Sequence, residues 1–212
     1  MITLIDLELG NLRSVINAVR RIGVEMSVAT QSCELEQCGP IILPGVGSFE
    51  KAMSRLKQNG MADIIKRRTT AEKIPLIGIC LGMQLLADTS EENGVHEGLG
   101  LIPGRIERLN PIEPGFRVPN IGWYNVEKAK SGTLFQNDYK ENDFYFIHSF
   151  HFQCDNQADV SATINYSGKK ITAAVERDSI CGIQFHPEKS QDAGIDLLNN
   201  SLNNLKNNGW LR

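Results

Sequence analysis

The chain has 212 residues, 41% of them hydrophobic, and a formal net charge of −3. This size and composition predict one α/β domain over residues 1–212 with a substantial core. A charge this close to neutral, without a block of basic residues, argues against a nucleic-acid partner. No apolar run approaches the roughly 18 residues that a membrane-spanning helix needs. We therefore expect neither a nucleic-acid nor a membrane partner.

The cysteines are scattered along the chain, are odd in number and form no Cys-x-x-Cys pair. This pattern supports neither a zinc site nor a disulfide framework, and no metal or cofactor is expected. Reduced thiols favour a cytoplasmic location. The strand-like start Met1–Asp6 also lacks the basic segment and long apolar core of a signal peptide. The cysteines are Cys33, Cys38, Cys80, Cys154 and Cys181.

The first half of the chain alternates between short apolar strands and helical patterns. Asn11 is a candidate N-cap for the first helix, and Gly23 is a candidate stop. Short apolar strands of this kind are typical of a parallel sheet covered on both faces. Strands are predicted at Ile2–Ile5, Met26–Ala29, Ile41–Leu43 and Leu76–Ile79, and helices at Leu12–Ile22, Phe49–Leu56, Met61–Ile65 and Leu81–Ala87.

The second half, from Gly100 to Ile183, reads instead as short strands with turn residues between them. This pattern predicts an antiparallel extension joined to the parallel sheet, followed by a closing helix over Ala193–Leu205. The predicted strands are Ile102–Leu109, Phe144–Ile147, Val160–Ile164, Ile171–Val175 and Ile180–Phe185.

A cysteine stands at the junction between one strand pattern and the next helix pattern. The apolar run ends at Cys80, and Gly78 and Gly82 flank it two positions away on either side. Gly-x-Cys-x-Gly is the thiol version of the strand–turn–helix elbow that presents a nucleophile. A helix N-terminus behind the sulfur lowers the pKa of a thiol, and the N–H of Leu81 can help to hold an oxyanion. A buried cysteine in an ordinary βα unit gives the same local pattern, so catalysis requires a base elsewhere.

A candidate base lies near the C-terminus, in the run Ile-Gln-Phe-His-Pro-Glu. The predicted strand Ile180–Phe185 brings His186 to its end, and Pro187 then turns the chain out of the sheet. In a thiol hydrolase a histidine takes the proton of the cysteine and later protonates the leaving amine, while a carboxylate orients the ring. A lone His-x-Glu also fits a surface turn. Together with the elbow, it predicts a triad of Cys80, His186 and Glu188.

The elbow Gly78–Gln84 and the late Phe185–Glu188 resemble the class I (triad) glutamine amidotransferases. The resemblance implies a flavodoxin-like, three-layer α/β fold with a mostly parallel central sheet and an antiparallel extension. It also implies hydrolysis of L-glutamine: the cysteine attacks the side-chain amide, a γ-glutamyl thioester forms, ammonia leaves, and water releases glutamate. The chain would then be a single glutamine amidotransferase domain.

The segment Ile42–Phe49 resembles the oxyanion segment of that family. The resemblance implies that the N–H groups of Val46 and Leu81 form the oxyanion hole. In the family this segment reorients, and a Pro-Gly-x-Gly turn has the backbone freedom to do so. An ordinary βα turn would carry the same glycines.

The same resemblance implies a glutamine pocket. Glu92 would pair with the ammonium group of the substrate, while Ser149 and nearby N–H groups would hold its carboxylate. Alternatively, Glu92 lies on a solvated face beside the equally charged Glu91. The expected pocket residues are Gly47, Gln84, Glu92, His148, Ser149 and Phe150.

More narrowly, several segments resemble the glutaminase subunits of imidazole glycerol phosphate synthases, enzymes of histidine biosynthesis. This resemblance implies a heterodimer with a (β/α)₈ barrel cyclase that uses the ammonia to make imidazole glycerol phosphate and AICAR. Lys189, directly after the triad glutamate, is placed to meet a partner's carboxylate, whereas Trp123 could also be a core aromatic. The segments are Gly10–Ser14, Leu43–Phe49, Gly98–Ile102, Val118–Trp123, Phe146–Ser149 and Gln184–Ser190. The expected interface residues are Asn11, Asn120, Trp123, Tyr145 and Lys189.

Five positions depart from the usual pattern of these subunits, and we expect them near the docking face. These departures leave open the alternative that the chain is a paralogous glutaminase, which supplies ammonia to a sugar amidotransferase in bacterial surface-polysaccharide synthesis. An inactive binding subunit fits a complete triad poorly, and a cysteine peptidase fits the pocket segments poorly. The departures are Leu7, Glu8, Asn120, Phe150 and His151.

Overall fold

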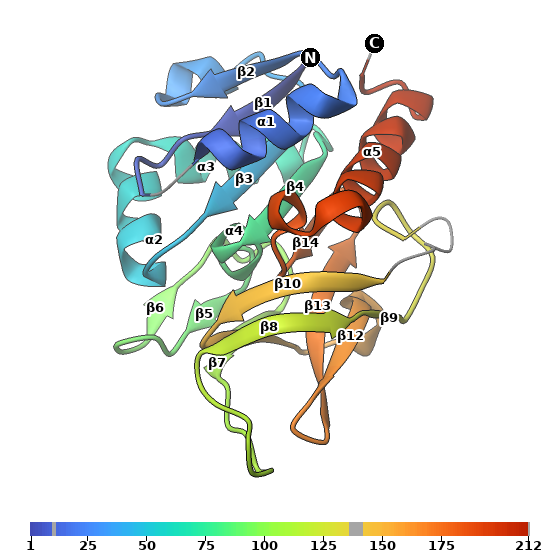
Figure 1. The fold of residues 1–212 in the computed structure, drawn as a ribbon. Helices are drawn as coiled ribbons and strands as arrows, with labels where there is room; N and C mark the ends of the chain where they lie inside the picture. Colours follow the sequence, from blue (N-terminus) through green and yellow to red (C-terminus); the bar gives the residue numbers. More distant parts are fainter. Residues whose placement is uncertain (10–11, 136–141, 212) are drawn as a thin grey trace.

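A central sheet of eight strands organises the structure, a computed structural model that describes residues 1–9, 12–135 and 142–211 (Figure 1). Its strand order is β2-β1-β3-β4-β14-β13-β12-β9. Pairings from β2 to β14 are parallel, and those from β14 to β9 are antiparallel. The predicted parallel sheet with an antiparallel extension is therefore confirmed. The strands are β1 (Ile2–Ile5), β2 (Met26–Ala29), β3 (Ile41–Gly45), β4 (Leu76–Cys80), β9 (Glu127–Lys128), β12 (Val160–Tyr166), β13 (Lys169–Arg177) and β14 (Ile180–Ile183).

Helices cover both faces of this sheet, which gives three layers. One apolar cluster joins Leu4 of β1 to α1 and α5, and the other joins Ile5 of the same strand to α2 and α3. Strands buried on both faces need a continuous apolar run, which is the pattern that the sequence carries. The helices are α1 (Leu12–Ile22), α2 (Phe49–Gln58), α3 (Met61–Thr70), α4 (Leu81–Gln84) and α5 (Gln191–Asn207), with 3₁₀ turns η1 (Ser32–Leu35), η2 (Gln157–Asp159) and η3 (Pro187–Lys189).

Two smaller sheets build the wall beside the carboxyl ends of the parallel strands. One pairs β8 with β10, and the other has the order β11-β7-β5-β6. Four of these strands, β5, β6, β8 and β11, were not predicted from the sequence. The strands are β5 (Thr89–Ser90), β6 (His96–Glu97), β7 (Gly104–Arg108), β8 (Asn120–Asn125), β10 (Asp143–His148) and β11 (Phe150–Cys154).

Three predicted elements end earlier than expected, and the strand predicted over Ile102–Leu109 does so by one residue, at Arg108. The helix expected over Leu81–Ala87 stops at Gln84, because N–H groups of the segment 99–102 take the carbonyl oxygens of residues 85–87. The strand expected to reach Phe185 stops at Ile183. One more ladder bond follows, from Gln184 N–H to the carbonyl of Ala173 at 2.8 Å.

No helix in the described part of the chain is long and apolar enough to cross a membrane. The candidate N-cap Asn11 lies outside the described residues.

Candidate active site

The predicted elbow forms at the carboxyl end of β4. Cys80 has φ 55° and ψ −110°, a backbone conformation that non-glycine residues rarely adopt. Such strain is characteristic of a nucleophile elbow. The flanking glycines are required, because a Cβ on Gly82 would overlap the carbonyl of Leu43 and one on Gly78 would lie 2.7 Å from Gly82. Helix α4 begins at the next residue, Leu81.

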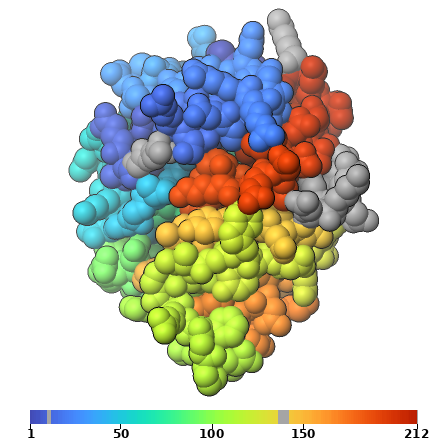
Figure 2. Space-filling model, viewed as in Figure 1, coloured from blue at the N-terminus to red at the C-terminus, as the bar shows by residue number. Residues whose placement is uncertain are grey.

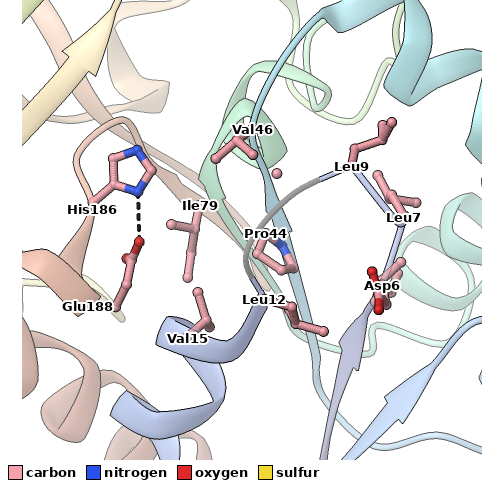
Figure 3. Close-up of a pocket in the computed structure, with 12 residues that line it drawn as sticks. Asp6, Leu7, Leu9, Leu12, Val15, Pro44, Val46, Ile79, His186 and Glu188 are labelled. Carbon is pink, nitrogen blue, oxygen red and sulfur yellow. Dashed lines mark hydrogen bonds and ion pairs between the residues drawn. The ribbon is translucent and has the colours of Figure 1, made fainter.

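His186 and Glu188 form a buried pair next to this elbow. The Nδ1 atom of His186 lies 2.8 Å from Oε1 of Glu188, and the two side chains are 4% and 5% exposed (Figure 3). Although β14 has ended, the backbone of His186 is held by a 2.9 Å hydrogen bond from its N–H to the carbonyl of Tyr145 in β10. Pro187 then opens η3, which carries the glutamate.

The surroundings of His186 favour its charged form. Burial alone would lower the pKa of the ring, but the neighbouring Cys80 and Glu188 favour the charged ring and raise the pKa to about 10. Nε2, the nitrogen that faces away from the glutamate, is buried without a geometric hydrogen-bond partner among the described residues. A charged imidazole beside a thiol is the arrangement of Cys–His nucleophiles.

A cavity of about 310 Å³ opens beside Cys80. It brings together Cys80, His186, both expected oxyanion residues and every expected pocket residue, while Glu188 lies behind the histidine. Pro119 and Ile147 also line it, although the sequence analysis did not single them out. The complete lining is Val46, Gly47, Cys80, Leu81, Gln84, Glu92, Pro119, Ile147, His148, Ser149, Phe150, His186 and Lys189.

The turn that carries Val46 separates this cavity from a smaller one. Gly47 has φ +100°, and a Cβ there would meet nothing within 4 Å, so backbone conformation rather than crowding calls for glycine. The smaller cavity, of about 40 Å³, lies between the His186–Glu188 pair and the segment after β1 (Figure 3). Its apolar lining includes Leu7, Leu9, Leu12, Val15 and Ile79.

Glu92 lies at the cavity and not on a solvated face. Its Oε2 accepts the backbone N–H of Phe49 at 2.7 Å, at the first residue of α2. This carboxylate therefore accepts a hydrogen bond at the N-terminus of the helix that follows the expected oxyanion turn, where a negative charge is favourable. The neighbouring Glu91 instead accepts the N–H of Arg108 at 2.6 Å.

Gln184 is a site residue that the sequence analysis did not single out. It is fully buried, and its Nε2 lies 3.7 Å from the sulfur of Cys80. Its Oε1 accepts from Nε2 of Gln84 at 2.9 Å. The available signal was a polar residue inside the strand predicted over Ile180–Phe185, since a buried polar group needs a partner.

Asn120 corrects one interface prediction. It is 1% exposed, and its Nδ2 lies 3.0 Å from Nε2 of His148, so it supports the cavity wall from inside. A side chain buried within the chain cannot meet a partner's surface. Leu7, another departure from the usual subunit sequence, is also buried. In the segment after β1, Glu8 is the departure that faces outward, where it is exposed and pairs with Arg55.

The other described interface residues gather on the outer face of β8 and β10. Trp123 is 47% exposed, which excludes a core aromatic, and its ring lies 5.8 Å from that of Tyr145. Nζ of Lys189 lies 5.9 Å from the Tyr145 ring. Ile121 and Ile147 are also exposed. We call the four residues Ile121, Trp123, Tyr145 and Ile147 the β8–β10 patch. Figure 2 shows β8, β10 and η3 side by side on one face.

The described residues contain no group of three or more His, Cys, Asp or Glu side chains that could hold a metal ion.

The geometry is that of a thiol amidohydrolase, and comparison with known proteins gives the family. The sequence profile described as glutamine amidotransferase class-I matches residues 3–205. The chain therefore belongs to the class-I glutamine amidotransferases and is a glutamine-hydrolysing enzyme.

Similar curated proteins within this family are synthase subunits. The imidazole glycerol phosphate synthase subunit HisH 2 of Nitrobacter winogradskyi is 43% identical over 206 residues, covering 95% of this chain and 97% of that protein. Subunit HisH of Bdellovibrio bacteriovorus is 42% identical over 202 residues, covering 94% and 98%. The resemblance drawn from the motifs is therefore confirmed.

Solved structures of the family share the fold. PurLQS of Thermotoga maritima superposes with a TM-score of 0.74 at 20% identity, covering 96% of this chain and 98% of that one. A structure described as glutamine amidotransferase gives 0.70 at 19% identity, covering 94% and 98%. At these identities the likeness shows the fold alone, and it confirms the flavodoxin-like class.

Proposed function

We propose that this chain hydrolyses L-glutamine through a thioester on Cys80 and passes the ammonia to a synthase partner. The observation that carries the proposal is the buried His186–Glu188 pair beside a strained cysteine at the wall of the 310 Å³ cavity. No cofactor takes part in this chemistry.

The steps follow from the positions of the side chains. The sulfur of Cys80 attacks the side-chain amide carbon of glutamine, and N–H groups of Val46 and Leu81 hold the resulting oxyanion. His186 protonates the nitrogen as the C–N bond breaks, and ammonia leaves. The neutral ring then takes a proton from water, which attacks the thioester and releases glutamate. Glu188 orients the ring throughout.

The substrate is held at its other end. Glu92 meets the α-ammonium group with its carboxylate, and Ser149 and its backbone neighbours meet the α-carboxylate. Gly47, Gln84, His148 and Phe150 shape the rest of the cavity, which they line. Because Glu92 also caps α2, the substrate's ammonium and the oxyanion turn share one anchor.

We also propose a heterodimer with a (β/α)₈ barrel cyclase that makes imidazole glycerol phosphate and AICAR in the cytoplasm. The relatives named as synthase subunits support this pathway. The β8–β10 patch supports the docking face, because exposed apolar residues beside a site mark an interface. Lys189 would meet a partner carboxylate there, and Asn11 is proposed at the same interface.

Reconstitution tests the pathway. The chain is mixed with the imidazole glycerol phosphate cyclase of its own organism, and product formation from glutamine is followed. We expect glutamine-dependent product and co-elution of the two proteins. No binding and no product would overturn the histidine pathway and favour the sugar amidotransferase alternative. The exposed Glu8, which departs from the usual sequence of the synthase glutaminases, is in keeping with that alternative.

A further inference from the structure

A chain of hydrogen-bonded side chains runs through the cavity wall and ends at the sulfur of Cys80. Nε2 of Gln184 lies 3.7 Å from Sγ, and Oε1 of the same amide lies 2.9 Å from Nε2 of Gln84. That Gln84 nitrogen also lies 3.1 Å from the carbonyl oxygen of Phe150. Gln184 is fully buried and Gln84 is nearly so.

The chain continues beyond Phe150 into β10 and β8. Nδ1 of His148 lies 2.8 Å from the same carbonyl oxygen, and its Nε2 lies 3.0 Å from Nδ2 of Asn120. Both side chains are buried. Because β8 also carries Trp123, the chain links the strand of the β8–β10 patch to the nucleophile.

The carbonyl of Phe150 determines the direction of each bond, because a backbone carbonyl only accepts. Gln84 must therefore present its amide nitrogen to this oxygen. The same nitrogen faces the Gln184 amide and can only donate there, so the Gln184 oxygen lies on that side. The nitrogen of Gln184 consequently points at Cys80. The hydrogen bonds thus decide which end of the amide is nitrogen and which is oxygen.

The carbonyl of Phe150 also determines the protonation state of His148. Its Nδ1 must carry a proton in order to bond the carbonyl of Phe150. Burial lowers the pKa of His148 to about 4, so the ring is neutral and its Nε2 offers only a lone pair. Asn120 therefore donates to it, which leaves the amide oxygen of Asn120 buried without a described partner.

We propose that Gln184 is a further catalytic residue, whose side-chain N–H donates to the Cys80 thiolate, and that Asn120, His148 and Gln84 are positioning residues that hold its amide in this orientation. This proposal deepens the proposed glutaminase function and rests on it. His186 then supplies the proton that moves, while Gln184 supplies a fixed donor to the same sulfur. Hydrogen bonds to an ionised group are stronger than neutral ones, so the donor favours the thiolate over the thiol.

The test is the pH dependence of Cys80 alkylation by iodoacetamide in the full chain. Alkylation is followed by mass spectrometry of the Cys80 peptide, because the exposed Cys33 also reacts. Gln184→Met keeps the length of the side chain and removes the donor. We expect its midpoint to move to higher pH by about one unit, a tenfold smaller thiolate fraction at a given pH.

A matched control separates this effect from the general loss of a buried amide. Asn204 in α5 donates its Nδ2 to the carbonyl of Thr133 at 2.9 Å, away from the cavity. Asn204→Leu should leave the alkylation midpoint unchanged. If Gln184→Met does not fold, Gln184→Leu also removes the donor without adding a charge, and should shift the midpoint in the same direction.

An unchanged midpoint in a folded Gln184 variant would overturn the proposal. So would an equal shift in Asn204→Leu. Alkylation needs neither glutamine nor a partner, so this result is independent of whether the wild-type chain hydrolyses glutamine.

Discussion

His148 and His186 line the same cavity, yet the structure drives their pKa values in opposite directions. Burial lowers the pKa of His148 to about 4, and its bonds to Asn120 and Phe150 suit a neutral ring. At His186 burial acts the same way, but Cys80 and Glu188 outweigh it and raise the pKa to about 10. One ring is kept neutral as part of the cavity wall, and the other is kept charged, which suits its proposed role as proton donor to the leaving group.

The pH dependence of stability tests the neutral state of His148. An ordinary histidine pKa of 6.5 in the unfolded chain exceeds the folded value of about 4, so the unfolded chain binds more protons between them. The contribution to the free energy of unfolding, about 3 kcal/mol, is present above pH 6.5 and is lost as pH falls through 4. Urea unfolding at pH 7 and pH 4 measures it. An equal pH dependence in His148→Gln would contradict the prediction.

Substitutions at the His186–Glu188 pair should differ in severity. His186→Ala removes the proton carrier and should lower kcat for glutamine by roughly 10²- to 10⁴-fold. Glu188→Gln keeps a hydrogen-bonding side chain, so orientation is only partly lost and the fall should be smaller. Steady-state glutamate release measures both. Equal losses would mean that Glu188 does more than orient the ring.

The residues of the proposed triad could be picked out from the sequence because each stands at a local motif, the elbow or the Pro-terminated strand. Gln184 could not, because its partners Gln84 and Cys80 come from a distant part of the chain and only the fold brings them together. Asn120 was misplaced for the same reason: its burial depends on pairing between β8 and β10.

At the scale of elements, prediction worked where one local rule determines the structure. Ile2–Ile5, Leu12–Ile22 and Met26–Ala29 have the predicted bounds, because each is a short apolar run or a clear helical period. Strand β8 was missed because it is half-exposed and contains Gly122, which weakens the strand pattern. The short α4 depends on the segment 99–102, whose N–H groups take the carbonyl oxygens of residues 85–87 just after the helix, and no local pattern reveals this.

The elbow should be intolerant of a methyl group at Gly82. Gly82→Ala drives a Cβ into the carbonyl of Leu43, so either the strand or the helix must move. We expect a loss of at least about 3 kcal/mol in the free energy of unfolding. Gly23→Ala is the control: its Cβ meets nothing within 4 Å, and only its φ of +82° costs about 1 kcal/mol. Equal losses in denaturant unfolding would argue against the close packing.

At the scale of the whole molecule, the cavity and the β8–β10 patch share Ile147, so the proposed docking face adjoins the proposed catalytic cavity. The chain hydrolyses glutamine, and ammonia released without an acceptor would be wasted. This arrangement favours a glutaminase whose activity depends on a docked partner.

The isolated chain should therefore hydrolyse glutamine slowly and speed up when its synthase partner and acceptor substrate are added. Trp123→Ala should weaken partner binding by about tenfold or more, as loss of an aromatic anchor does. Its Cys80 alkylation profile should match that of the wild type. Full activity of the chain alone, or unchanged binding by Trp123→Ala, would contradict this docking face.

The most direct test of the account compares wild type and Cys80→Ala, each in complex with the synthase partner. Product formation is measured with glutamine and, separately, with ammonium at raised pH. We predict that Cys80→Ala loses glutamine-dependent product and glutamate release but keeps ammonium-dependent product. Continued glutamate release from glutamine by Cys80→Ala would contradict it.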